Sequence, residues 1–305
     1  MGLNLRLLFL IFIFVFDFYF IWLIPDTKKI ILNYYMKNSN IKVVVVATHN
    51  ERFFDSFKDS CKKNGIEPVI LGWGKKYTGH LMKDDMLIEY LENNKNNDII
   101  LFVDAFDCLV IQHIELLKQA FLKSKKKIII SCEDNIQNKS LTHIFTYIQN
   151  MFFGSVNKNL INTGMFVGYR DDLLKSLNII RTYRENHINS NQRIWTNALN
   201  NSKNLRNLIH IDKNEKFFIN FTILKDTNFN YLKKKKPFVI QGNGFLDLNK
   251  FCKKLGYKKS EIKISNMIKY SINFLFYYFL PYIIYLFLGL CIYFVIRKTI
   301  KDFTK

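Results

Sequence analysis

Residues 99–107 have the sequence Ile-Ile-Leu-Phe-Val-Asp-Ala-Phe-Asp. The apolar residues that open this stretch predict a strand buried on both faces, because only a central strand of a covered sheet hides side chains that point both ways. Two carboxylates, Asp104 and Asp107, follow where that strand should end. In open α/β sheets the ligand crevice lies beyond the carboxyl ends of the strands, so acids placed there face a site.

Paired carboxylates at this edge suit a divalent metal ion. Hard oxygen ligands favour Mn²⁺ or Mg²⁺, and such a metal would in turn hold phosphate oxygens. We therefore expect a metal-dependent nucleotide-sugar site at Asp104 and Asp107. The alternative is that both residues only cap or flank the next helix.

The residues before this stretch predict a parallel sheet. An apolar, β-branched strand over 41–47 ends at Thr48, where a base or ribose usually docks. An amphipathic helix over 52–64 and a strand over 68–71 follow, and this succession favours a right-handed crossover. A glycine-containing loop comes next. Lys83, at the start of a helix that runs through Leu91, could reach a diphosphate or could be an ordinary surface lysine.

The residues after this stretch continue the α/β pattern. We expect a helix over 115–123, strands over 127–131 and 160–169, a helix from 171, another over 194–199, and a strand over 237–240. In the second of these strands, Gly164 would let backbone approach a sugar closely, and Asn162 could hydrogen-bond its hydroxyls. Gly242 and Gly244, after the last strand, suggest a tight turn that lies near the ligand, or simply a tight turn.

Two long apolar runs flank the central region. Residues 7–24 are interrupted only by Asp17 and predict an uncleaved signal-anchor, whereas residues 274–296 carry no charge and predict a membrane span. We therefore divide the chain into an anchor at 1–25, an α/β domain at 40–250 and a transmembrane helix at 270–297. Basic residues flank both runs, so the orientation in the membrane stays open.

Composition narrows the choice of partners. The chain has 305 residues and a formal net charge of +20, but its lysines are scattered and no nucleic-acid-binding signature accompanies them. We therefore expect no nucleic-acid partner. The densest basic run, 233–236, predicts a solvated loop, with a phosphate or lipid surface as the alternative. The five cysteines have no Cys-x-x-Cys spacing, so neither a zinc site nor a disulfide framework is implied.

Several motifs occur together between residues 42 and 244. They are Val-Ala-Thr at 46–48, Leu-Gly-Trp-Gly at 71–74, Phe-Val-Asp-Ala-Phe-Asp at 102–107, Ser-Cys-Glu at 131–133, Asn-Thr-Gly-Met-Phe-Val-Gly-Tyr at 162–169, Asp212 with Lys216 and Phe218, and Gly-Asn-Gly at 242–244. In this order and spacing they resemble the glycosyltransferase domain of the multifunctional procollagen lysyl hydroxylases, which also occurs in free-standing and viral forms.

The resemblance implies a GT-A fold, that is, a Rossmann-like, mostly parallel sheet with flanking helices. It also implies a UDP-sugar donor, Mn²⁺ (or Mg²⁺), and a retaining transfer to a hydroxyl, which in collagen-like substrates adds glucose to galactosyl-hydroxylysine. By this likeness Asp104 and Asp107 bind the metal, with Gln241 as a third ligand. The remaining donor-site residues that it implies are Thr48 at the uridine, Lys83 at the diphosphate, Asn162 and Gly164 on the sugar side, and the turn Gly242, Asn243 and Gly244.

The chain departs from the family pattern at three places. Gln241 stands where the family has a histidine; its amide oxygen is a feebler ligand that still suits a hard cation. At the catalytic position, taken here as Asn191 and Gln192, the family has an acidic run before the glutamine, whereas in this chain Asn189-Ser190-Asn191 leads into Gln192. Since an amide cannot act as base or nucleophile, Glu133 or another carboxylate would have to fill any such role. Ala105 and Phe106 replace a hydroxyl-bearing pair.

The leading interpretation is a membrane-anchored glycosyltransferase that moves a hexose, glucose or galactose, to a protein or glycan acceptor. As the family implies, its catalytic domain would face the lumen of the endoplasmic reticulum or Golgi; a viral or host membrane is the other location considered. One alternative is a GT-A-like domain that binds a nucleotide sugar or glycan without turnover. Another is a membrane scaffold whose basic domain holds anionic lipid or nucleic acid. The linkage and the oligomeric state stay open.

Overall fold

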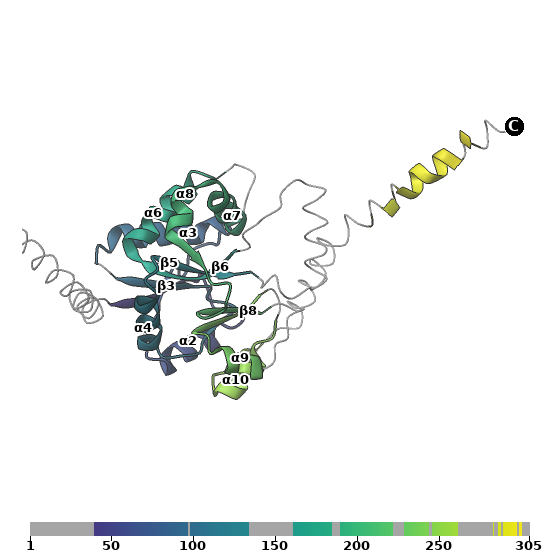
Figure 1. The fold of residues 1–305 in the computed structure, drawn as a ribbon. Coiled ribbons are helices and arrows are strands. Elements are labelled where there is room, and N and C mark those ends of the chain that lie inside the picture. Colours follow the sequence, from purple (N-terminus) through teal and green to yellow (C-terminus); the bar gives the residue numbers. More distant parts are fainter. Residues whose placement is uncertain are drawn as a thin grey trace, which may run out of the picture.

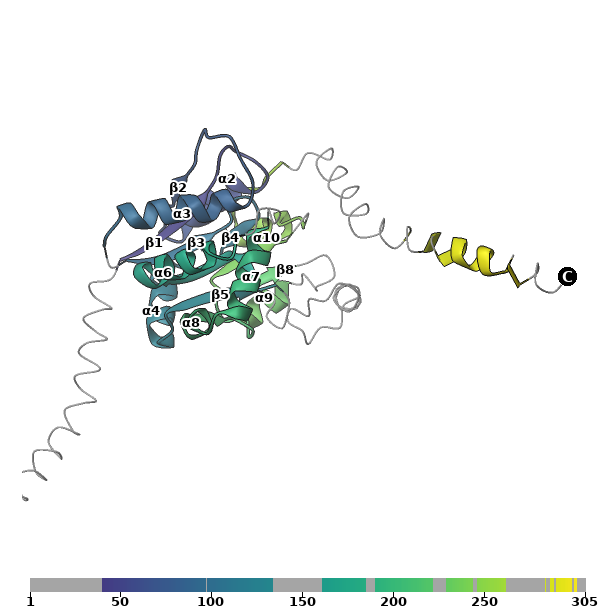
Figure 2. The same ribbon diagram turned by 90° about the horizontal axis from the view of Figure 1, so that it is seen from above.

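The computed structural model describes residues 40–96, 98–133, 161–184, 190–221, 229–243 and 246–261, together with parts of 283–300. These residues form a central sheet covered by helices on both faces, with a smaller sheet beside it (Figures 1 and 2). The six strands of the central sheet are β1 (Ile41–Val46), β2 (Val69–Leu71), β3 (Ile99–Val103), β5 (Ile128–Cys132), β6 (Ile161–Tyr169) and β7 (Ile209–Ile211).

The central sheet has the strand order β2-β1-β3-β6-β5-β7 and is parallel except at β6. Strand β6 runs antiparallel to both β3 and β5 and pairs Met165 with Val103. All five residues of β3 are buried, as the double-sided apolar run predicted. The mostly parallel α/β sheet of the predicted fold class is therefore present.

Helices cover the two faces of this sheet with separate apolar cores. The helices are α2 (Phe54–Lys63), α3 (Leu81–Asn93), α4 (Ile114–Ser124), α6 (Arg170–Arg181), α7 (Asn191–Asn201), α8 (Lys203–Leu208), α9 (Phe229–Lys235) and α10 (Asn249–Leu255). Helices α2 and α4 pack on one face, and α3, α6, α7 and α8 on the other (Figure 1). Because β3 contributes to both cores, it stands at the centre of the domain.

A second sheet begins where β3 ends. Its strands are β4 (Cys108–Val110), β8 (Phe218–Phe221) and β9 (Val239–Gly242), in the order β4-β9-β8. Strand β4 is antiparallel to β9, and β8 is parallel to β9. Helices α9 and α10 share an apolar core with this sheet. The short segment 104–107 therefore joins the two sheets, which places both of its carboxylates at their junction.

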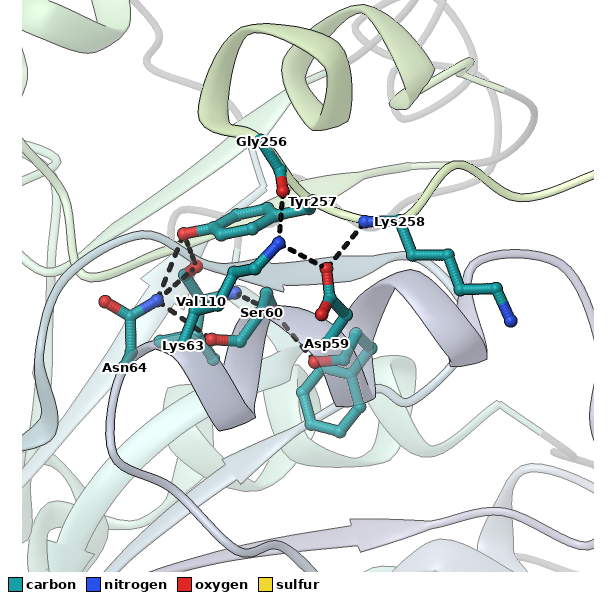
Figure 3. A network of polar contacts seen from close by, with 9 residues as sticks. Asp59, Ser60, Lys63, Asn64, Val110, Gly256, Tyr257 and Lys258 are labelled. Carbon is teal, nitrogen blue, oxygen red and sulfur yellow. Dashed lines mark hydrogen bonds and ion pairs between the residues drawn. The ribbon is translucent and has the colours of Figure 1, made fainter.

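Residues after α10 are tied to α2 by polar contacts (Figure 3). The hydroxyl of Tyr257 accepts a hydrogen bond from Asn64 Nδ2 at 3.0 Å and donates to the carbonyl of Val110 at 2.8 Å. The backbone N–H of Lys258 donates to Asp59 Oδ2 at 2.6 Å. These contacts fasten the end of the described domain onto a helix that packs beneath the central sheet.

Two predictions require correction. The predicted fold class included transmembrane helices at both ends, but no helix in the part of the chain that the structure describes is long and apolar enough to cross a membrane. The run 7–24 lies outside the described residues, and only parts of 274–296 are described. The basic run 233–236 is also no plain loop, because α9 includes its first three lysines and its apolar face buries Leu232.

Candidate active site

The two predicted metal ligands lie together with Gln241 at the junction of the sheets. In the second sheet Gln241 pairs with Cys108, so its side chain lies beside the segment 104–107. Gln241 Nε2 donates to Asp107 Oδ1 at 3.1 Å and approaches Asp104 Oδ2 at 3.4 Å. The element that follows Asp107 is strand β4, not a helix. The alternative that these acids only cap a helix is therefore wrong.

The side chains at this junction fit a hard divalent cation. Gln241 is 3 % exposed, and its Oε1 is buried without a hydrogen-bond partner. A Cβ at Gly164 would lie 2.8 Å from both Gln241 Oε1 and Asp104 Oδ2, so these two oxygens converge over the glycine. The described residues contain no group of three or more His, Cys, Asp or Glu side chains that could hold a metal. The third oxygen here belongs to an amide, which Mn²⁺ and Mg²⁺ accept.

Lys83 lies against the carboxylate pair. Its Nζ donates to Asp104 Oδ1 at 2.7 Å. Burial disfavours the charged lysine, but the Asp104 carboxylate outweighs it, so the pKa of Lys83 lies above its usual value. Burial, aided by the charge of Asp104, raises the pKa of Asp107 to about 6, and the charge of Arg52 opposes that rise. Keeping Asp107 ionised beside Asp104 in this buried place therefore costs free energy, and a bound cation would lower that cost.

Strand β6 brings backbone close to these carboxylates. The N–H of Asp104 donates to the carbonyl of Gly164 at 2.7 Å, and the N–H of Gly164 donates to Asn162 Oδ1 at 2.7 Å. A Cβ at Gly164 would also come within 2.6 Å of Gln241 Nε2. The sequence analysis predicted that Gly164 lets backbone approach a sugar, and that role stays a prediction. In the structure the side chains of Asp104 and Gln241 occupy the space that a Cβ at Gly164 would fill.

Glu133 is the centre of a second cluster. Three side-chain amides donate to its carboxylate: Asn162 at 3.1 Å, Gln192 at 3.0 Å and Asn243 at 2.7 Å. The side chain of Asn220, on β8, donates to the backbone carbonyl of Glu133 at 3.0 Å. The sequence analysis did not single out Asn220, because an asparagine inside an apolar strand carries no motif. The structure thus brings three predicted residues, Asn162, Gln192 and Asn243, around the carboxylate of a fourth, Glu133.

The remaining predicted residues lie at different distances from these clusters. Thr48 is buried, its hydroxyl bonds to His49 Nδ1 at 2.9 Å, and its carbonyl accepts from the N–H of Gly74. The N–H of Gly242 donates to the carbonyl of Asp107 at 2.8 Å. Asn191 is buried and hydrogen-bonds to Asp84. Gly244 lies outside the described residues.

The sequence analysis noted Trp73 only within the motif at 71–74 and Phe106 only as a departure from the family, and it assigned no role to either ring. Trp73 is 55 % exposed and stacks on Phe54, with ring centroids 5.5 Å apart. Phe54 in turn contacts Phe106, which packs against His49 at 5.7 Å. A tryptophan between two glycines was the available signal, because glycines on both sides allow a turn that projects a ring into solvent.

Comparison with known proteins places this geometry in a family. The family model described as PLOD GT domain matches residues 37–257, which include both clusters. The chain belongs to the PLOD GT domain family. The resemblance predicted from the motifs is therefore confirmed.

Relatives of this PLOD GT domain include much longer proteins. It is 29 % identical over 142 residues to the Drosophila melanogaster procollagen-lysine,2-oxoglutarate 5-dioxygenase, covering 43 % of this chain and 19 % of that protein. It is 24 % identical over 231 residues to the Gallus gallus procollagen-lysine,2-oxoglutarate 5-dioxygenase 1, covering 68 % of this chain and 30 % of that protein. It is also 26 % identical over 132 residues to uncharacterized protein R699 of Acanthamoeba polyphaga mimivirus, covering 40 % and 28 %. The chain spans less than a third of the length of these relatives.

Proposed function

We propose that this protein is a metal-dependent glycosyltransferase that moves a hexose from a UDP-sugar to a hydroxyl acceptor. The observation that carries the proposal is the convergence of Asp104, Asp107 and the partnerless Gln241 oxygen at the junction of the two sheets, inside a domain of the PLOD GT family. A relative from Caenorhabditis elegans, 24 % identical over 228 residues, bears the name multifunctional procollagen lysine hydroxylase and glycosyltransferase.

The carboxylate pair and Lys83 form the diphosphate side of this proposed site. Asp104, Asp107 and Gln241 would hold Mn²⁺ or Mg²⁺, which neutralises charge on the departing diphosphate when bound. Lys83, positively charged and 2.7 Å from Asp104, adds a second cation at the same place. Trp73 and Phe106 offer aromatic surface for a uracil ring, next to Thr48 at the end of β1.

Glu133 and its amides form the sugar side of this proposed site. In the transfer, the bond between the anomeric carbon and the phosphate oxygen breaks, the new glycosidic bond forms to the acceptor oxygen, and the proton of the acceptor hydroxyl passes to the departing UDP phosphate. The ring carbon gains positive charge on the way, and the Glu133 carboxylate is placed to stabilise that charge. Asn162, Gln192 and Asn243 hold this carboxylate in one orientation and can also hydrogen-bond sugar hydroxyls.

The acceptor class follows from the relatives rather than from the geometry. We propose a hydroxyl of a hydroxylysine-linked or other glycan, with glucose or galactose as the transferred sugar and the secretory lumen as the place of reaction. A second candidate is a domain that binds nucleotide sugar without turnover. The observation in its favour is that Lys83 and the Gln241 amide already donate hydrogen bonds to Asp104 and Asp107.

The test is release of UDP by the purified full chain from UDP-glucose, UDP-galactose and related donors, with Mn²⁺, Mg²⁺ or EDTA, with and without a galactosyl-hydroxylysine peptide. Metal-dependent release that disappears in Asp104→Ala would establish the transferase. Binding of UDP without release under any of these conditions would favour the second candidate. Absence of UDP binding would remove both.

A further inference from the structure

Asp84 is a buried carboxylate that the proposed chemistry does not use. It follows Lys83 in α3, and its residue is 5 % exposed. The indole Nε1 of Trp195 donates to Asp84 Oδ2 at 3.0 Å, and the side chain of Asn191 forms a second hydrogen bond with it. Both donors belong to α7 and lie four residues apart, which places them on the same face of that helix. The Asp84 carboxylate therefore binds one face of α7.

The surroundings of Asp84 make an ionised carboxylate expensive to keep. Burial raises the pKa of Asp84 to about 6, while the hydrogen bond from Trp195 and the charges of Arg184 and Lys83 lower it. Arg184 forms its ion pair with the neighbouring Asp85, at 2.6 Å. Because well-packed apolar residues usually stabilise such a position better than a buried ion does, packing alone gives no reason for Asp84.

The contact between Asp84 and α7 matters because α7 also carries Gln192, a partner of Glu133. Asn191 and Gln192 are its first two residues, and they point to different carboxylates. Asn191 bonds to Asp84, whereas Gln192 Nε2 donates to Glu133 at 3.0 Å. The start of the helix is thus held between Asp84 and the sugar side of the site.

Helix α3 also contacts the diphosphate side of the proposed site, through Lys83, the residue before Asp84. Lys83 donates to Asp104 in the first cluster, and the next residue, Asp84, accepts from Trp195 of α7, the helix that carries Gln192. We propose that Asp84 is a positioning residue that sets α7 so that Gln192 orients Glu133, and thereby fixes the sugar side of the site relative to the diphosphate side. The expected effect of Asp84 on kcat rests on the proposed function. Its expected effect on the position of α7 rests on geometry alone.

The first test compares Asp84→Asn with Asp85→Asn, which removes the same charge from the adjacent, half-exposed position in α3. We expect D84N to lower kcat for transfer by about tenfold to a hundredfold, because a hydrogen bond to a charged group is lost. KM for the UDP-sugar should stay within about twofold, as should the affinity for UDP alone. D85N should match the wild type. An unchanged kcat in D84N would overturn the proposal.

Amide hydrogen exchange separates this inference from the proposed function, because it needs no turnover. In D84N, exchange at residues 191–195 should accelerate while exchange in β3 stays as in the wild type. The unfolding midpoint at neutral pH should not fall, because a costly buried charge is removed. If the wild type transfers no sugar at all, the exchange result alone decides: acceleration confined to α7 supports the positioning role, and unchanged exchange rejects it.

A double-mutant cycle tests whether Asp84 acts through Gln192. In a Gln192→Ala background, D84N should cause little additional loss of kcat, because the contact that it positions is already gone. Additive losses would mean that Asp84 acts by another route and would overturn the proposal. Trp195→Phe, which keeps the ring but removes the donor, should reproduce part of the D84N effect on both kcat and exchange.

Discussion

The two carboxylate clusters of the site are built in opposite ways. Around Asp104 and Asp107, like charges are crowded together, the pKa of Asp107 is raised by burial, and the Gln241 oxygen lacks a partner. Around Glu133, one carboxylate receives three amide hydrogen bonds. An incompletely satisfied cluster is suited to receive a cation, whereas a satisfied one is suited to hold a fixed shape. The difference indicates which half should depend on metal.

Removing one acid of the first cluster should have the largest effect. Asp104→Ala deletes both a metal ligand and the partner of Lys83, so we expect UDP release to fall by at least about a thousandfold. Isothermal titration with Mn²⁺ should show loss of binding. Asp171→Asn, which removes an exposed carboxylate paired with Arg170, is the matched control and should keep both properties. Retained Mn²⁺ binding in D104A would break the assignment of the metal to this cluster.

The carboxylate that joins the two halves should make stability depend on pH. Asp84 has a folded-state pKa of about 6, above its ordinary 3.8, so the proton favours the folded state. The wild type should therefore lose stability relative to D84N as pH rises from about 4 to 6, by at most about 3 kcal/mol, with no further change above that range. Urea unfolding of both proteins measures this difference. A difference that does not vary with pH would contradict the titration of Asp84.

Changing Glu133 to glutamine should separate the clusters. Glutamine has an NH₂ group in place of one carboxylate oxygen, and this group donates instead of accepting. The hydrogen bonds from Asn162, Gln192 and Asn243 therefore cannot all persist. We expect kcat to fall about a hundredfold while the affinity for Mn²⁺ and UDP stays unchanged. Steady-state kinetics and calorimetry measure the two effects. A parallel loss of Mn²⁺ affinity would show that the halves are not independent.

Two glycines of β6 provide the smallest and most specific test. A methyl group at Gly164 would meet Gln241 and Asp104 within 2.8 Å, whereas one at Gly168 would meet Ile128 at 2.8 Å in the apolar core. Gly164→Ala should weaken Mn²⁺ binding about tenfold by displacing the Gln241 side chain. Gly168→Ala should lower the unfolding midpoint without altering Mn²⁺ affinity. Equal Mn²⁺ affinities in the two variants would contradict the role given to Gly164.

Local pattern was sufficient to predict much of the central sheet. The run at 99–103 is apolar at every position, and such a run is stable only where both faces are covered, so β3 had to be central. The acids that follow it had to lie at the carboxyl edge of the sheet for the same reason. The turn and motif residues around them identified the family, which the match over residues 37–257 confirmed.

Other features depend on contacts between distant residues. The antiparallel direction of β6, the pairing of Gln241 with Cys108 and the contact of Asn220 with Glu133 each join residues far apart in the chain. The burial of Asp84 is a further case, because its charge and position in α3 are those of an ordinary surface residue.

The sequence by itself therefore determined the apolar strands, the position of the acids at a strand end and the family. These depend on residue types a few positions apart, whose periodicity reflects local backbone geometry. Only the tertiary structure decided that Lys83 contacts Asp104 while Asp84 contacts helix α7, and that Glu133 lies among the side-chain amides of Asn162, Gln192 and Asn243. Those arrangements are set by how helices and sheets pack, which no short stretch of sequence records.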